Sequence, residues 1–280
     1  MKILNFNSRR GVIKVMAKRD LKATLYGVGI YIVIFVCLVI SALAVKTTFI
    51  DSVNENTMLV TTNPLSFPLF LCVFISAIYL ALIASIALSR ERDRGTMEVL
   101  FYGPVDSISY ISAKFLEHLV YYLVMLVIFV IYFVAGGYLI NVGITSGFLA
   151  GLPLSLFLVS AVISFGIFLS AITTRVRTSV LVFLIIMIGF VGIEISNTLL
   201  SGLEKEKVTT TILYVKSGLG YLNRILEWVS PFSYLNRGLD AVAIGSLGNY
   251  LLSLLGSIIY SVILLAIAVL AFERKGVRRV

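Results

Sequence analysis

The chain has 280 residues, of which 59% are apolar and 13% charged, and its mean hydropathy is +1.04. Soluble globular domains are about 45–50% apolar and about 25% charged, so this composition excludes a water-soluble fold, a disordered chain and a disulfide scaffold. The 23 Lys and Arg residues exceed the 14 Asp and Glu residues, which gives a net charge of +9. In a membrane chain such an excess is typical of cytoplasmic loops, so we do not expect nucleic-acid binding.

A basic leader of 26 residues precedes the first apolar run. Lys14, Lys18 and Lys22 repeat every four residues and form one cationic stripe, with apolar residues roughly opposite. This pattern predicts an amphipathic helix lying along the inner surface of the membrane, in contact with lipid. The alternative is a basic segment that serves only as a topology signal.

Six apolar runs are long enough to cross the ~30 Å hydrocarbon core of a bilayer as helices. The runs are Gly27–Val45, Leu69–Leu88, Leu119–Ile140, Phe148–Ile172, Ser179–Leu200 and Leu251–Phe272. They are apolar on all sides, whereas strands of a membrane barrel alternate between apolar and polar residues. We therefore expect an all-α polytopic membrane protein with six transmembrane helices and one domain, 1–280.

Lys and Arg are distributed unevenly between the connecting segments. The leader 1–26, the loop 89–118, the turn 173–178 and the tail 273–280 hold 17 of them. The segments that fall on the opposite side, 46–68, 141–147 and 201–250, hold 6. The basic side of a membrane protein is cytoplasmic, so we expect both termini in the cytoplasm of a cell-membrane protein.

The chain lacks the residues of the common catalytic and metal sites. It has no G-x-x-x-x-G-K-[ST] phosphate loop, so it does not bind ATP in that way by itself. His118 is the single histidine, which cannot supply the paired ligands of a zinc motif and is expected to be a packing residue. We expect no catalytic residue, cofactor or metal in this chain.

The two cysteines are expected to remain unpaired. Counted from the outer ends of their spans, Cys37 and Cys72 differ in depth by about five residues, or ~7 Å along a helix. A disulfide requires Cα atoms within ~7 Å overall, so pairing is disfavoured. The cysteines are therefore interpreted as small packing residues.

Ionisable residues are sparse within the apolar runs, which contain only Glu194. Glu194 could line a water-filled cavity, but it is better explained as reaching the interface or bonding a neighbouring helix. The second span also has Ala77, Ala81, Ser85 and Ser89 at four-residue spacing, a pattern typical of close helix packing. Packing within the chain is favoured over a contact face with another subunit.

The segment 201–250 is long for a plain connection and contains apolar residues. Two short helices are expected on either side of Ser230-Pro231, lying on the outer interface or dipping in and out of it. Trp228, Tyr221 and Tyr234 suit an interfacial position.

The loop after the second run interleaves acidic and basic residues, unlike a plain topology signal. Glu91, Asp93 and Glu98 lie among arginines, and a short helical segment with an apolar side follows, ending in a Gly-Pro break. Exposed apolar residues beside mixed charges favour a protein surface over anionic lipid. The loop therefore predicts a docking helix for a cytosolic partner; the alternative is a loop folded against its own helix ends.

At this loop the chain resembles the ABC-2-type permeases, the membrane subunits of ABC transporters, in the branch of the nitrous-oxide-reductase maturation and gliding-motility permeases. The family shows an acidic–basic stretch, G-T-[LM]-E-x-L-L, P-V-[ST] and a Lys that opens the third span. The matching residues are Arg90–Arg94, Gly95, Thr96, Met97, Glu98, Leu100, Pro104, Val105 and Lys114, then Ser230-Pro231-Phe232-Ser233, Arg237-Gly238, Tyr250 and the tail Phe272–Lys275. Phe101 and Asp106 depart from the family pattern.

The resemblance implies a permease that pairs as a homodimer or heterodimer and receives a separate cytosolic ATPase, which binds ATP and Mg. The loop 89–105 would be the coupling helix, and the leader with Lys14, Lys18 and Lys22 the connecting helix. Residues expected to contact the ATPase are Arg90, Glu91, Arg92, Arg94, Gly95, Thr96, Met97, Glu98 and Leu100. Export is expected from the resemblance, and the alternatives are a secondary carrier without an ATPase or a membrane scaffold that docks a cytosolic partner.

Overall fold

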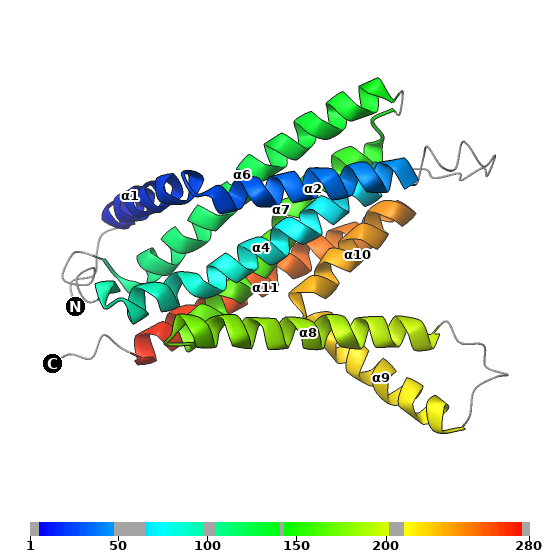
Figure 1. Cartoon of the computed structure of the whole chain (residues 1–280). Coiled ribbons are helices and arrows are strands. Elements are labelled where there is room, and N and C mark those ends of the chain that lie inside the picture. Colours follow the sequence, from blue (N-terminus) through cyan, green and yellow to red (C-terminus); the bar gives the residue numbers. More distant parts are fainter. Residues whose placement is uncertain (1–5, 48–64, 98–104, 141–142, 202–209, 276–280) are drawn as a thin grey trace.

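The computed structural model describes residues 6–47, 65–97, 105–140, 143–201 and 210–275, and the numbered elements within them are α-helices. The helices are α1 (Phe6–Leu25), α2 (Val28–Val45), α4 (Ser66–Asp93), α6 (Ser107–Leu139), α7 (Ser146–Ile172), α8 (Val176–Ser201), α9 (Thr210–Val229), α10 (Pro231–Ile244) and α11 (Leu247–Lys275). Six of these described helices, α2, α4, α6, α7, α8 and α11, are long and apolar enough to cross a membrane. They confirm the six expected runs (Figure 1).

Two of the six spans form the centre of the bundle. In α7 72% of the apolar window is buried and in α4 56%, against 28% or less in the other four spans. The two helices cross closely at Gly166, where a Cβ atom would lie 2.5 Å from the carbonyl oxygen of Ala81. The absence of a side chain at Gly166 is therefore what lets the two backbones approach, as small residues do in membrane bundles.

The stripe of small residues in α4 faces this crossing. Ala77, Ala81 and Ser85 are fully buried. Nearby, the Ser170 hydroxyl of α7 accepts hydrogen bonds from the backbone N–H groups of Leu88 and Ser89, each at 3.0 Å. The stripe thus packs within the chain.

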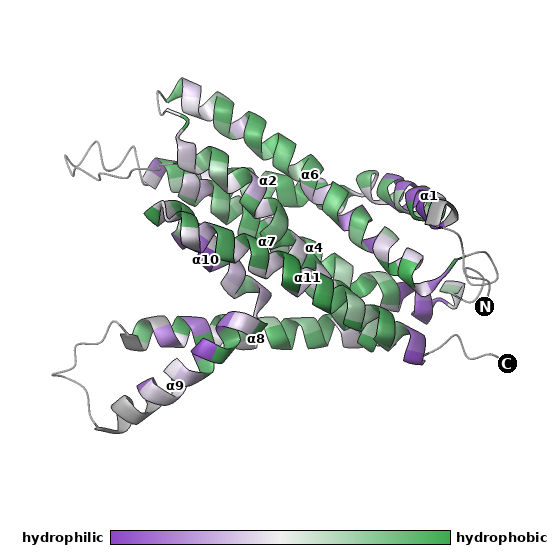
Figure 2. Cartoon of the chain, turned by 180° about the vertical axis from the view of Figure 1, so that it is seen from behind, coloured by the Kyte–Doolittle hydropathy of each residue, from purple (hydrophilic) through white to green (hydrophobic). Residues whose placement is uncertain are grey.

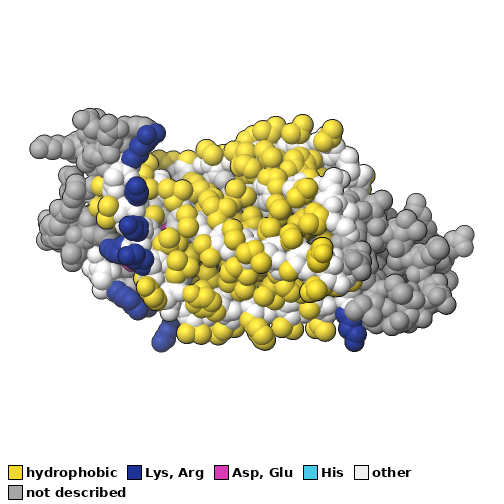
Figure 3. Space-filling view, turned by 90° about the horizontal axis from the view of Figure 1, so that it is seen from above, with side chains coloured by type: hydrophobic (Ala, Val, Ile, Leu, Met, Phe, Trp, Pro, Cys, Tyr) yellow, Lys and Arg dark blue, Asp and Glu magenta, His cyan; other side chains and the backbone are white. Residues whose placement is uncertain are grey.

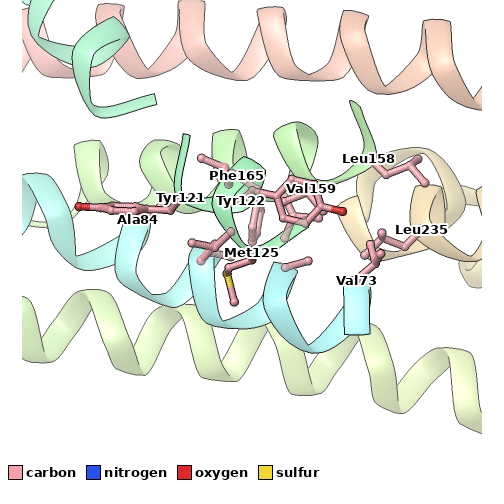
Figure 4. Close-up of a cluster of buried hydrophobic side chains, with 14 of the residues drawn as sticks. Val73, Ala84, Tyr121, Tyr122, Met125, Leu158, Val159, Phe165 and Leu235 are labelled. Atoms are coloured by element: carbon pink, nitrogen blue, oxygen red, sulfur yellow. The ribbon is translucent and has the colours of Figure 1, made fainter. Parts of the chain in front are cut away.

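Aromatic and aliphatic side chains fill the space around the α4–α7 pair. Figure 4 shows Tyr122 and Met125 of α6 beside Val159 of α7, with Val73 of α4 and Leu158 of α7 nearer to α10. All five are buried. The core thus joins three spans, and at Leu235 it also reaches α10 (Figure 4).

Helix α6 begins twelve residues before the apolar run Leu119–Ile140. Asp106 caps the helix, because its carboxylate accepts a hydrogen bond from the backbone N–H of Ser109 at 3.3 Å. The added turns carry Lys114 and Glu117, whose burial requires partners from other helices.

The segment 201–250 contains α9 and α10, which meet at Ser230. Helix α10 packs against α4, α7 and α11 inside the bundle, while α9 packs against α8 and α10. At the bend, the Tyr260 hydroxyl of α11 donates a hydrogen bond of 2.6 Å to the carbonyl oxygen of Val229. Trp228 and Tyr221 are exposed, whereas Tyr234 is 4% exposed and its ring lies 5.2 Å from that of Tyr260. The interfacial position of all three residues stays a prediction.

Cys37 and Cys72 lie closer together than their sequence positions predict. Each thiol approaches the other residue's carbonyl oxygen, at 3.8 Å for Cys37 and 3.4 Å for Cys72, and both thiols are free. The expected difference of about five residues between the depths of Cys37 and Cys72 was too large, because α4 begins at Ser66, three residues before the apolar run. Cys37 therefore lies eight residues from the end of α2 at Val45, and Cys72 six residues from Ser66.

Charge and hydropathy separate along the helix axes. The spans are hydrophobic over most of their length, and hydrophilic residues gather at α1 and the neighbouring helix ends (Figure 2). From above, a row of Lys and Arg borders a continuous hydrophobic surface at the end of the molecule where α1 lies (Figure 3). We call this the basic end; it holds α1, the end of α4, the start of α6 and the end of α11 (Figure 1).

Candidate functional site

The turn after α4 ends this central helix abruptly at the basic end. Gly95 has φ +68°, a left-handed conformation that glycine adopts without the steric cost of a side chain. The Thr96 hydroxyl donates a hydrogen bond of 3.1 Å to the carbonyl oxygen of Glu91, which satisfies one of the last open carbonyls of α4. A new helical segment starts at Thr96 and Met97, where the described part ends.

The residues expected to dock a partner divide into two groups in the structure. Arg90, Arg94, Gly95 and Thr96 are exposed around the turn, whereas Met97 is 7% exposed. Glu98 and Leu100 were predicted to belong to the same contact and lie outside the described residues.

Arg92 points into the bundle. Its guanidinium donates hydrogen bonds to the carbonyl oxygens of Thr173, at 2.7 Å, and Ala171, at 3.4 Å, at the end of α7. It also lies 5.5 Å from the centre of the Phe272 ring of α11. Arg92 therefore joins the ends of three spans and is largely occupied within the chain.

Glu91 also points inward, where it meets a buried lysine. One carboxylate oxygen lies 2.8 Å from Lys114 Nζ, and the other accepts a hydrogen bond of 2.7 Å from the Tyr110 hydroxyl. Lys114 Nζ lies 2.7 Å from the carboxylate of Asp20 in α1 and 3.7 Å from that of Glu117. We call Lys114, Asp20, Glu91 and Glu117 the lysine cluster; it connects α1, α4 and α6.

The α1 side of the lysine cluster is held by further bonds. The Tyr121 hydroxyl of α6 donates to the carbonyl oxygen of Asp20 at 2.9 Å, and Arg19 pairs with the Asp20 carboxylate at 2.8 Å. Burial raises the pKa of Asp20, but the charge of Lys114 and the hydrogen bonds from Arg19 and Lys114 outweigh this, so the pKa lies below its ordinary value. Asp20 is therefore a carboxylate that anchors α1 to α6.

A cavity of about 260 Å³ opens beside the lysine cluster and reaches Arg94 and Thr96 of the turn. His118 lines it and is 1% exposed; its Nδ1 lies 2.7 Å from the carbonyl oxygen of Lys114, and its Nε2 has no hydrogen-bond partner within the described structure. The expectation of a packing histidine agrees with this burial. Among the described residues, no group of three or more His, Cys, Asp or Glu side chains could hold a metal ion.

The cationic stripe of the leader lies on α1 as the pattern indicates. Lys14, Lys18 and Lys22 are exposed, and Met16 is 7% exposed. Near the start of α1, Arg9 forms an ion pair of 3.0 Å with Asp106, the capping residue of α6. Helix α1 is thus docked on α6 at both of its ends, at Arg9 and at Asp20.

Glu194 lies away from the basic end, on α8. Its carboxylate accepts a hydrogen bond from the Asn236 side chain of α10. This contact with a neighbouring helix is one of the two explanations favoured from the sequence, and a role in lining a cavity stays a prediction.

The lysine cluster was missed by reasoning from the sequence. Lys114 was noted only as a family match, and its partners Asp20 and Glu91 lie 94 and 23 positions away in the chain. The spacing of Lys114 and Glu117, three residues apart on one helix face, was the one local signal of an ion pair.

The match to known families agrees with this geometry. A model of the ABC-2 family transporter proteins matches residues 16–277. The chain therefore belongs to the ABC-2 family: it is a membrane permease of an ABC transporter and is not catalytic by itself. No curated protein matches the chain.

Proposed function

We propose that the chain is the membrane half of an ATP-driven exporter, moved by a separate cytosolic ATPase that grips the turn after α4. In this proposal the basic end faces the cytoplasm, as the excess of Lys and Arg favours. The permease works as a pair, with a second copy or a paralogue. Its proposed contact residues are Arg90, Arg94, Gly95 and Thr96, together with Glu98 and Leu100.

The observation that carries this proposal is the position of the turn at the end of α4, one of the two helices at the centre of the bundle. Arg94, Gly95 and Thr96 are exposed, while the helix that they terminate packs against five others, α2, α6, α7, α8 and α10. A force applied at the turn therefore reaches the centre of the bundle directly.

The inward-pointing residues link the turn to the rest of the basic end. Arg92 holds α4 to the ends of α7 and α11, and Glu91 holds it to Lys114 of α6 and, through Lys114, to α1. We therefore assign Glu91 and Arg92 to transmission within the permease, whereas the sequence suggested that they touch the ATPase. An ATPase that closes on ATP would shift α1, α4 and α6 together, and such coupling requires contacts that differ between two states of the bundle.

Site-specific crosslinking tests the proposal. Thr96→Cys, labelled with a photoactivatable maleimide, is expected to crosslink in native membranes to a protein that mass spectrometry identifies as an ATPase with a phosphate loop. Arg177→Cys is the matched control, because it is an exposed position in the first turn of α8. Cys37 and Cys72 are fully buried and do not compete for the label.

Two results would contradict the proposal. Equal crosslinking from both positions would mean that the ATPase contact is not specific to the α4 turn. Capture of a protein without a nucleotide site from Thr96→Cys alone would favour the scaffold alternative.

A further inference from the structure

A second opening at the basic end lies between α1 and α6. It has a volume of about 600 Å³, within the ~300–1,000 Å³ of ligand pockets. Its walls are largely apolar and are supplied by Ile13, Ala17, Leu21, Leu116 and Val120. We call it the α1–α6 groove.

Cations line the rim of this groove. Lys14 and Lys18, two exposed members of the α1 stripe, line it together with Arg10. In the described part of the chain, neither Lys14 nor Lys18 forms an ion pair. The groove therefore combines an apolar floor with a cationic edge.

The carboxylate of Glu117, which also lines the groove, does not neutralise the positive charge of Lys14 and Lys18. Glu117 is 5% exposed, and its side chain contacts Lys114 at 3.7 Å and the Tyr121 hydroxyl at 3.3 Å. Those contacts belong to the lysine cluster on the inner side of α6, whereas Lys14 and Lys18 are open to the surroundings.

We infer that the α1–α6 groove binds an anionic phospholipid, with the headgroup phosphate at Lys14 and Lys18 and an acyl chain along the apolar floor. The row of cations borders the hydrophobic surface of the bundle, which is where headgroup and hydrocarbon meet (Figure 3). A cation near an anionic membrane surface favours binding by about 1 kcal/mol, roughly a fivefold preference. The inference does not depend on the ATPase contact, because the groove lies outside the α4 turn.

Short-range fluorescence quenching in bilayers tests this inference. Trp228 is the single tryptophan of the chain, so Leu116→Trp in a Trp228→Phe background places the only indole at the groove. The full chain is reconstituted in phosphatidylcholine with increasing fractions of brominated phosphatidylglycerol. Quenching is expected at lower fractions of brominated phosphatidylglycerol than of brominated phosphatidylcholine.

Single-charge variants separate a site from general surface charge. Lys14→Gln and Lys18→Gln are each expected to weaken the preference for phosphatidylglycerol roughly fivefold. Lys22→Gln removes the same charge one turn away, outside the groove, and is expected to leave the preference within twofold. Ala17→Trp, read by native mass spectrometry of retained phosphatidylglycerol, is expected to reduce retention with all the lysines intact.

Three outcomes would overturn the inference. One is an equal loss in Lys18→Gln and Lys22→Gln, which would show a diffuse surface effect. Another is the absence of any preference for the anionic lipid. The third is relief of quenching by soluble glycerol phosphate, which would assign the cations to a free phosphate.

Discussion

Replacing Lys114 with methionine should destabilise the protein more than any other single change of charge at the basic end. The side chain of Lys114 is 8% exposed, and it faces three carboxylates, two of them within 2.8 Å. Removing the cation leaves these carboxylates buried without their partner, and breaking a buried ion pair in this way costs about 3–5 kcal/mol.

The expected change in thermal stability follows from this cost. In a chain of this size, each 1 kcal/mol lowers the unfolding temperature by roughly 2–4 °C, so Lys114→Met should lower it by roughly 10 °C. The assay can use the protein's own thiols, because Cys37 and Cys72 are fully buried and free. A thiol-reactive dye that fluoresces on coupling reports unfolding in detergent.

Arg19→Ala is the matched control, since Arg19 contacts the same Asp20 carboxylate as Lys114. Its side chain is 58% exposed, so this ion pair is screened by solvent and should contribute about 0–1 kcal/mol. The triple variant Lys114→Met, Asp20→Asn and Glu91→Gln should recover most of the loss, because it removes the two uncompensated carboxylates that lie closest to the lysine. If Lys114→Met unfolds within about 2 °C of the wild type, the lysine cluster does not hold α1, α4 and α6 together.

Two further predictions concern the core. Gly166→Val should prevent the approach of α7 to the Ala81 backbone and lower the unfolding temperature measured by calorimetry. Gly189→Val is the control and should have little effect, because the space around its Cβ position is open. Similar decreases in unfolding temperature for the two variants would contradict the close crossing of α4 and α7. Cys37 and Cys72 should react with maleimide only after denaturation, since both are fully buried, and rapid labelling of the folded chain in a mass spectrum would refute this packing.

The positions of the membrane helices could be predicted from the sequence because they depend on runs of apolar residues. Runs of about twenty apolar residues define membrane helices by length alone, so α2 and α7 begin within two residues of the expected positions. The start of α6 was not predictable in this way, because the polar residues Lys114 and Glu117 look like loop residues until their distant partners are known. Their burial in the bundle depends on the lysine cluster, which is a tertiary contact.

The same distinction applies to the site. Gly95 and Thr96 were identified from the sequence because they match the family motif G-T-[LM]-E-x-L-L, which is a local signal. The directions of Glu91 and Arg92 were not, since alternating charges on a helix do not reveal which side faces a neighbour. The burial of Tyr234 within the chain was not predictable for a similar reason, because a tyrosine suits both an interface and a buried position with a hydrogen-bond partner.

The lysine cluster has a consequence for how the protein is made. Asp20 is synthesised 94 residues before Lys114, so the first helix leaves the ribosome long before its main counterion exists. Helix α1 can take its final place only after the third membrane span has been inserted. The cluster therefore makes the attachment of the N-terminal helix a late step of biogenesis, and a chain truncated before residue 114 would keep that helix undocked.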